Sequence, residues 1–164
     1  MKNARTSLLL FAGIALTSIA AQPSSVQKLV VTGDVEKPLE LTLNDLMRMP
    51  RATVRTPGNP GAEYEGVWLR DILVRAGAPM GQNLRGKALA SYVLAKASDG
   101  YQVLFTLAEV EPQLGGERLL VADKKDGQSL PKDQAPLRIV CPDDKEGARS
   151  VRMLESLEVV RLRK

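Results

Sequence analysis

Short apolar runs, each bounded by glycine, proline or polar residues, predict a chain built mainly of β-strands. Some runs alternate between apolar and polar positions, as expected of a strand with one exposed face, and others are continuously apolar, as expected of a buried strand. Asp99-Gly100 and Asp126-Gly127 predict tight turns between consecutive strands. The predicted strands cover residues 29–33, 39–41, 52–56, 90–95, 101–105, 119–122, 137–141 and 157–161.

Three short segments have helical rather than strand spacing. Thr42 is a typical N-cap for a helix that ends before Pro50. Residues 69–76 place their apolar side chains on one helical face, and Gly77 follows as a natural helix end. A third helix begins at residues 108–110. The pattern therefore predicts an α+β fold that is mostly β, with short peripheral helices.

The first 21 residues have the pattern of a secretory signal peptide. Two basic residues precede an uncharged apolar run at 8–19, which is shorter than the ~20 residues of a membrane anchor, the alternative interpretation. We expect cleavage after Ala20 or Ala21 and a periplasmic or secreted protein. No twin-arginine pair precedes the run, so export in the unfolded state is expected. Residues 22–164 then form one domain.

Composition removes several function classes. The chain has 23 basic and 19 acidic residues; without residues 1–21, which hold two basic and no acidic ones, 21 face 19 and the net charge is +2. No concentrated basic face for nucleic acid is expected. Histidine is absent, which removes the commonest general base and metal ligand. The only cysteine, Cys141, can form no intramolecular disulfide and is expected to be a small buried hydrophobe, with a reactive thiol as the alternative.

The most chemically suggestive stretch is 132–142, a predicted buried strand with Arg138 near its start. A polar loop, 143–149, leads from it to Ser150 and Arg152. Two guanidinium groups, a hydroxyl and free backbone N–H groups suit an anion or a flat polar ligand. The alternative is a solvated hairpin with ordinary surface charges.

The order of these landmarks resembles the molybdopterin-binding domain of the sulfite oxidase family, present here as a lone domain. The matching pieces span most of the chain from Leu29 to Val160 in the family's order and spacing, and together they are fairly specific. They are Tyr64-Glu65-Gly66-Val67-Trp68-Leu69, Ser98-Asp99-Gly100-Tyr101, Leu119-Leu120, Pro136-Leu137-Arg138-Ile139-Val140, and Gly147 through Ser150-Val151-Arg152.

The resemblance implies a fold that holds a cofactor's pterin and phosphate through backbone and polar groups. The arginine of the family's Pro-Leu-Arg piece is Arg138, and the polar residue ahead of it is Asp133. The family's Ser-Val-Lys piece is Ser150-Val151-Arg152 here, a change that keeps the positive charge and adds a planar fork.

One departure concerns the metal. In the family's enzymes a cysteine thiolate from the loop after the strand equivalent to 52–56 binds molybdenum, whereas this chain has Arg55-Thr56-Pro57-Gly58-Asn59 there. Cys141 aligns with the apolar end of another strand and cannot readily replace that ligand. We therefore expect no molybdenum and no redox catalysis of the family's kind.

A pterin site needs an aromatic or guanidinium face, a carboxylate and hydrogen-bond donors. Each aromatic residue could instead belong to the core, Asp99 could belong to a plain hairpin turn, and Arg138 could pair with Glu117 or Asp144 as a structural salt bridge. The candidate pterin-binding residues are Arg55, Tyr64, Trp68, Asp99, Tyr101, Asp133, Arg138, Asp144, Ser150, Val151 and Arg152.

The resemblance and the missing thiolate ligand leave three alternative functions. The first is an exported, non-catalytic protein that binds a molybdopterin-like or free reduced pterin. Cofactor-free relatives of this kind imply a membrane-bound signalling partner, such as a cyclic-di-GMP enzyme with a periplasmic domain. The second is a molybdopterin-dependent oxidoreductase with atypical metal attachment, and the third is an interaction module with an empty pocket.

Overall fold

The computed structural model describes residues 27–58, 60–116 and 118–162, so the predicted signal peptide lies outside the described residues. The strands are β1 (Lys28–Gly33), β2 (Leu39–Thr42), β3 (Ala52–Arg55), β4 (Glu63–Trp68), β5 (Ser91–Ala97), β6 (Gln102–Thr106), β7 (Leu120–Lys125), β8 (Gln128–Ser129), β9 (Arg138–Val140) and β10 (Leu154–Arg161). The α-helices are α1 (Leu43–Met47), α2 (Leu69–Arg75) and α3 (Leu107–Val110), and the 3₁₀ turns are η1 (Gly81–Asn83), η2 (Gly86–Ala90), η3 (Pro112–Leu114) and η4 (Gly147–Arg149).

The helix ends form where the sequence predicts them. Thr42 caps α1 by accepting a hydrogen bond from the Asp45 N–H at 3.2 Å, while the Asp45 carboxylate accepts from the Thr42 N–H at 2.9 Å. This reciprocal pair satisfies two backbone N–H groups that the helix itself cannot pair. Gly77 follows α2 with φ +76°, a left-handed conformation that most other residues adopt only under strain.

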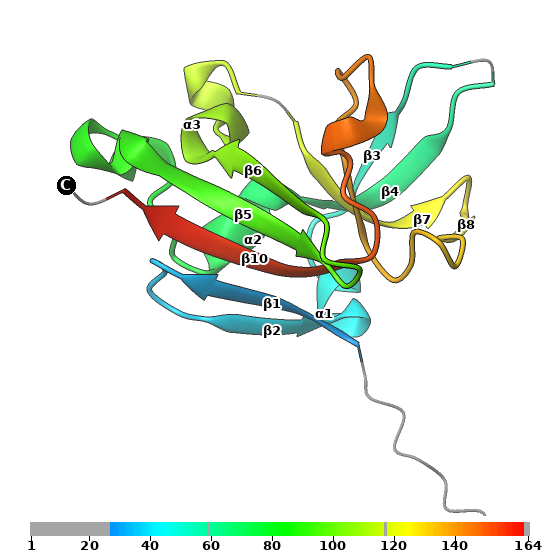
Figure 1. The fold of residues 1–164 in the computed structure, drawn as a ribbon, viewed down its shortest axis with the longest axis horizontal. Coiled ribbons are helices and arrows are strands. Elements are labelled where there is room, and N and C mark those ends of the chain that lie inside the picture. The colour runs from blue at the N-terminus through cyan, green and yellow to red at the C-terminus, as the bar shows by residue number, and fades with distance from the viewer. Residues whose placement is uncertain (1–26, 59, 117, 163–164) are drawn as a thin grey trace, which may run out of the picture.

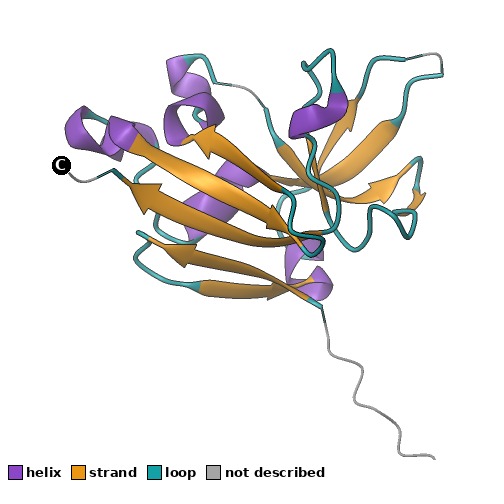
Figure 2. Ribbon diagram, viewed as in Figure 1, coloured by secondary structure: helices purple, strands orange, loops and turns teal. Residues whose placement is uncertain are grey.

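The strands form two sheets (Figures 1 and 2). One has the order β2-β1-β10-β5-β6, and the other has the order β3-β4-β7-β8 with β9 also paired to β7. The first strand lies parallel to the last, with Val31 opposite Leu157, whereas the other pairs in both sheets are antiparallel. The first and last strands of the described residues are thus neighbours in one sheet. The mostly β, α+β class predicted from the sequence is confirmed.

The main hydrophobic core draws on both sheets and on α2. Val31 and Leu157 come from the first sheet, Val67 and Ile139 from the second, and Ile72 from α2; each is fully buried. Burial of aliphatic side chains on this scale contributes roughly 1.5–3 kcal/mol per residue. The core therefore fixes the two sheets relative to each other, and with them the loops at their ends.

Gly66 lies where the paired strands β4 and β7 approach each other closely. A β-carbon at this position would lie 2.1 Å from the backbone oxygen of Val121, so any other residue would force the two strands apart. The pairing of β4 with β7 also shifts register between Glu65 and Gly66. This glycine in the aromatic-rich Tyr64–Trp68 run therefore serves strand packing.

The pairing of β5 with β10 fixes which segments lie at each end of the two strands. Ser91 lies opposite Arg161 at one end, and Ala97 lies opposite Leu154 at the other. The 98–101 turn therefore sits where the chain enters β10, and the Ser98 N–H donates to the Met153 carbonyl at 3.0 Å. Among residues 27–162, apart from 59 and 117, no helix is long and apolar enough to cross a membrane.

Candidate functional site

A small hollow of about 210 Å³ opens at this turn. Its walls come from two chain segments that are far apart in sequence, the 98–101 turn and the η4 segment that leads into β10. Four of its lining residues are predicted site residues: Asp99, Tyr101, Ser150 and Arg152. The structure therefore brings the Ser-Asp-Gly-Tyr and Ser-Val-Arg pieces together around one cavity.

Hydrogen bonds hold the walls of this hollow in place. The Tyr101 hydroxyl donates to the Ala148 carbonyl at 2.7 Å, so the ring spans the gap between the two segments. The Asp99 carboxylate accepts from the Tyr101 N–H at 2.9 Å through one oxygen. Ser150 accepts from the Cys141 N–H at 3.2 Å, which leaves its hydroxyl hydrogen as a donor.

Arg152 is the exposed cation of the hollow. It forms an ion pair with Asp133 at 3.3 Å, and the side chains of Arg152 and Asp133 are 55% and 61% exposed. An ion pair this exposed contributes about 0–1 kcal/mol, because water and salt screen it. A ligand can therefore displace either partner at a small cost in free energy. Through this ion pair Asp133, another predicted site residue, is connected to a lining residue of the hollow.

Arg138 belongs to a separate, more buried cluster. Its guanidinium donates to the Tyr64 hydroxyl at 2.9 Å and to the Gln134 side-chain oxygen at 2.8 Å, and it lies 5.1 Å from the centre of the Tyr64 ring. The Arg138 Nε is buried and has no protein partner among the described residues. A buried donor without an acceptor costs free energy, so this position favours an added acceptor from water or ligand.

Of the two acids predicted as alternative partners of Arg138, only Asp144 lies among the described residues, and no ion pair between it and Arg138 forms there. Asp144 is bound by Arg149, at 2.9 Å and 2.6 Å, and Glu117 lies outside the described residues. Arg138 and Val140 lie on one face of β9, whereas Ile139 points into the main core on the other. Arg138 therefore does not line the hollow that Arg152 lines.

The remaining predicted site residues lie elsewhere. Arg55 is 82% exposed and pairs with Glu63 across the β3–β4 hairpin. Trp68 lines a different hollow, of about 300 Å³, beside α2 and the segment before β7. Val151 is fully buried and accepts at its carbonyl from the Ile139 N–H, so it fixes the backbone rather than contacting a ligand.

Arg149 fastens the loop that forms one wall of the hollow. Besides its two bonds to Asp144, it donates to Glu109 on α3 and lies 5.7 Å from the centre of the Phe105 ring. One guanidinium thus ties the 143–149 loop to β6 and α3. No local sequence pattern predicts these contacts of Arg149, because Asp144 and Glu109 lie 5 and 40 residues away from it along the chain.

Replacing Arg149 by methionine should release this loop while leaving the sheets intact. We expect backbone amides at 143–149 to exchange hydrogen at least tenfold faster, since their local opening loses three side-chain interactions. Lys145→Met is the matched control, because Lys145 is exposed and forms no ion pair within the described part of the chain. Equal exchange in the two variants would contradict the role given to Arg149.

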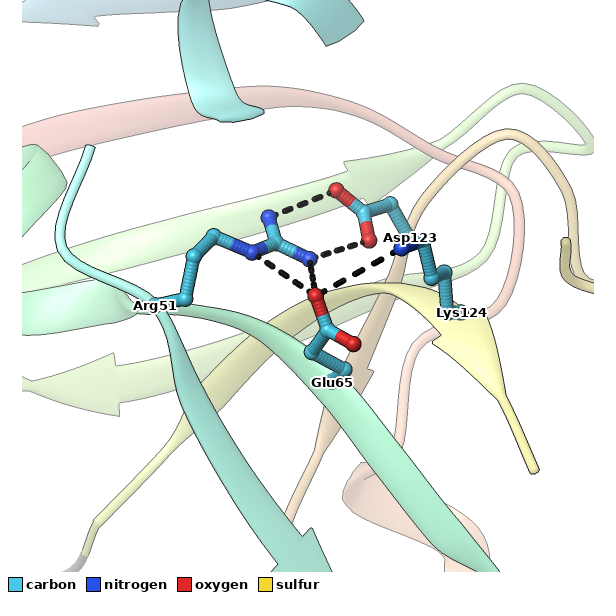
Figure 3. A network of polar contacts seen from close by, with 4 residues as sticks. All are labelled: Arg51, Glu65, Asp123 and Lys124. Carbon is cyan, nitrogen blue, oxygen red and sulfur yellow. Dashed lines mark hydrogen bonds and ion pairs between the residues drawn. The ribbon is translucent and has the colours of Figure 1, made fainter. Parts of the chain in front are cut away.

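A second feature that sequence analysis missed is the polar network at the start of β3 (Figure 3). Arg51 donates to both oxygens of Asp123, at 2.8 Å and 2.6 Å, and to Glu65 at 3.2 Å and 2.9 Å. Its hydrogen bond holds the pKa of Glu65 below the ordinary value. Lys124 lies 3.7 Å from the same Glu65 oxygen. The network joins β3, β4 and β7 by charge as well as by backbone pairing.

Glu111 is the most deeply buried acid of the described residues, with its side chain 1% exposed. Burial raises its pKa, but N–H groups of Gly81 and Gln113 and the Arg70 guanidinium favour the carboxylate, so the pKa lies below its ordinary value. The carboxylate therefore contributes stability above the unfolded-state pKa of about 4.3, and this is lost as the pH falls through the lower folded-state pKa.

Replacing Glu111 by glutamine should cost about 1–2 kcal/mol at pH 7, because charge-assisted hydrogen bonds become neutral ones. The measurement is urea unfolding at pH 7 and at pH 3. The unaltered protein should lose more free energy of unfolding between these pH values than Glu111→Gln does. An identical pH dependence would show that the pKa of Glu111 is not lowered in the native state.

A molybdenum centre of this family's kind requires a thiolate ligand, and Cys141 is the only cysteine of the chain. The Cys141 side chain belongs to the main core, and the residue is 4% exposed. No cluster of three histidine, cysteine, aspartate or glutamate residues suited to a metal occurs in the described ranges. The buried thiol does not fit a soft-metal ligand, whereas the hollow offers the groups that a flat polar ring can use.

The chain is similar to a known protein family in sequence and to a known structure in fold. The family described as "Oxidoreductase molybdopterin binding domain" matches residues 18–164. The crystal structure of the sulfane dehydrogenase SoxCD from Paracoccus pantotrophus is similar in fold, with a TM-score of 0.65 and 24% sequence identity. The match covers 85% of this chain and 40% of that one. No curated protein shows significant sequence similarity.

Proposed function

Because the chain belongs to the oxidoreductase molybdopterin-binding domain family, we propose that it binds a pterin in the hollow at the 98–101 turn and performs no redox chemistry. The observation that carries this proposal is the meeting of Asp99, Tyr101, Ser150 and Arg152 around one cavity. These residues come from two of the pieces on which the family resemblance rests.

The lining of the hollow is complementary to a pterin. A pterin is flat, and its edge carries adjacent N–H donors and a carbonyl acceptor. Asp99 can accept from the N–H groups, Arg152 and Ser150 can donate to the carbonyl, and the Tyr101 ring offers an aromatic face that is 48% exposed as a residue. A volume of about 210 Å³ is below the ~300–1,000 Å³ of pockets for drug-sized ligands, which suits a single fused ring system.

The absence of catalysis is proposed from the donor chemistry. Molybdenum is held and tuned by a thiolate in the family's enzymes, and the single thiol of this chain is buried in the core. The loop after β3 carries Arg55 and Thr56 where the resemblance implies that ligand. A bound pterin without its metal would leave the protein as a ligand-binding domain.

We further propose that the protein is exported and reports its ligand to a membrane-bound signalling protein. The signal-peptide pattern of residues 1–21 supports export to the periplasm or the medium. The signalling role is supported by the resemblance to cofactor-free relatives that contact periplasmic domains, including those of cyclic-di-GMP enzymes. The chain spans 40% of the length of the SoxCD chain it matches.

The test is to purify the protein from the exported fraction, denature it, and analyse the released material by mass spectrometry and elemental molybdenum measurement. Stoichiometric pterin without molybdenum is the expected result. Stoichiometric molybdenum would overturn the proposal in favour of an oxidoreductase with atypical metal attachment. If neither is found, titration with 6-methyltetrahydropterin decides between a weakly held ligand and an interaction module with an empty pocket.

A further inference from the structure

A third and much larger cavity lies at the other end of β5 and β10. This groove, of about 880 Å³, is bounded by the β1–β2 connection, α2, the 77–88 segment and the last residue of β10. Because β5 has seven residues at about 3.3 Å each, roughly 20 Å separates this end of the strand from the 98–101 turn. The groove is therefore a site distinct from the proposed pterin hollow.

The rim of the groove carries an excess of positive charge. Arg85, Lys87 and Arg161 line it, are exposed, and form no ion pair within the described residues. A fourth cation, Arg70, is already neutralised by Glu111 at 3.2 Å. Asp34 and Glu36 are the acids on the rim, so the charge of the groove remains positive.

Two backbone N–H groups anchor the end of β10, which carries Arg161. The Leu162 N–H donates to the Ala90 carbonyl at 2.9 Å, which ties the end of β10 to η2. The Arg161 N–H donates to the Asp34 carboxylate at 3.1 Å, which ties it to the β1–β2 connection. Arg161 and η2 thus lie at one corner of the first sheet.

The groove also has apolar side chains in its lining. Val74 on α2 is 47% exposed, and Ala78 and Met80, each only 7% exposed, also contribute to the lining. An exposed apolar side chain with cations along the rim is complementary to a ligand with apolar groups on one side and carboxylates on its edges.

From this charge complementarity we propose that the groove binds an acidic, amphipathic peptide segment of a partner protein. The carboxylates of the segment pair with Arg85, Lys87 and Arg161, and its apolar side chains cover Val74. This inference does not depend on pterin binding. It gives the molecule two separate binding ends, one for a small ligand and one for a protein.

The test uses the full mature chain and a fluorescein-labelled peptide of alternating glutamate and leucine, with fluorescence anisotropy as the readout. A peptide with lysine in place of glutamate is the charge control. The double variant Arg85→Glu/Lys87→Glu should weaken binding of the acidic peptide at least tenfold, and Val74→Asp should weaken it as well. The matched control, Lys132→Glu/Lys145→Glu, makes the same change in net charge away from the groove and should leave affinity unchanged.

Three results would overturn the proposal. One is failure of the acidic peptide to bind, and a second is equal weakening by both double variants, which would indicate general charge attraction. The third is full competition by inorganic pyrophosphate together with insensitivity to Val74→Asp, which would indicate a small-anion site. Titration of the same variants with 6-methyltetrahydropterin separates failure here from failure of pterin binding.

Discussion

Replacing Arg51 by methionine should lower the free energy of unfolding by about 2–3 kcal/mol. Breaking a fully buried ion pair costs about 3–5 kcal/mol, because the remaining charge stays buried without a partner. The Asp123 side chain is only 8% exposed, whereas that of Arg51 is 23% exposed, so part of the penalty is relieved by water. The measurement is urea unfolding at pH 7, with circular dichroism as the readout.

A control for this prediction lies on the strand that follows. Arg55 pairs with Glu63 at 2.9 Å, a geometry similar to that of the Arg51 pair, but its side chain is 82% exposed. Arg55→Met should therefore cost only about 0–1 kcal/mol. The two variants remove the same functional group, so their difference measures the combined effect of burial and of the second carboxylate that Arg51 binds.

The double variant Arg51→Met/Asp123→Leu tests the mechanism. If the loss comes from an unpaired buried carboxylate, removing that carboxylate should recover part of the lost stability. A double variant less stable than Arg51→Met alone would contradict this account. It would show that Asp123 stabilises β7 through contacts other than the ion pair.

The elements of this fold could be predicted because their signals are local. Thr42 with Asp45 predicts the start of α1, and Gly77 predicts the end of α2. Asp126 and Gly127, at φ +51° and +76°, form the predicted tight turn. Each signal lies within a few residues of the feature it specifies. The alternation of apolar residues in Val93, Ala95 and Ala97 likewise marks the buried face of β5.

Sheet order and ion pairs could not be predicted in this way. The parallel pairing of β1 with β10 joins residues about 126 apart, as in Val31 and Leu157, and no local pattern carries that information. The same holds for Arg51 and Asp123, which are 72 residues apart. Arg51 stands next to a proline at the start of a strand and resembles any surface cation in the sequence.

The candidate site was predictable in part because it rests on two contiguous pieces. The Asp99-Tyr101 and Ser150-Arg152 pieces do meet, and the structure adds that Asp133 joins them through Arg152. Arg55 and Trp68 are also predicted site residues, Arg55 as a hydrogen-bond donor and Trp68 as an aromatic face, but both side chains lie elsewhere. Order along the chain therefore identifies the pieces of a site better than its individual side chains.

The meeting of the Asp99-Tyr101 and Ser150-Arg152 pieces leads to the prediction with the largest expected effect on binding. Arg152→Leu should weaken binding of 6-methyltetrahydropterin ten- to a hundredfold, because a hydrogen bond to a charged group contributes about 1.5–3 kcal/mol and each 1.4 kcal/mol is a factor of ten. Stability should hardly change, since the ion pair of Arg152 with Asp133 is exposed. Isothermal titration calorimetry provides the affinity, and thermal unfolding provides the stability.

Arg55→Leu is the matched control, because Arg55 is also an exposed, paired arginine among the predicted site residues but lies at the β3–β4 hairpin. We expect its affinity for the same pterin to equal that of the unaltered protein. Tyr101→Leu, which removes the aromatic face and the bond to the Ala148 carbonyl, should weaken binding as Arg152→Leu does. If Arg55→Leu weakened binding while Arg152→Leu did not, the ligand would lie against the second sheet, and the hollow at the 98–101 turn would have no part in pterin recognition.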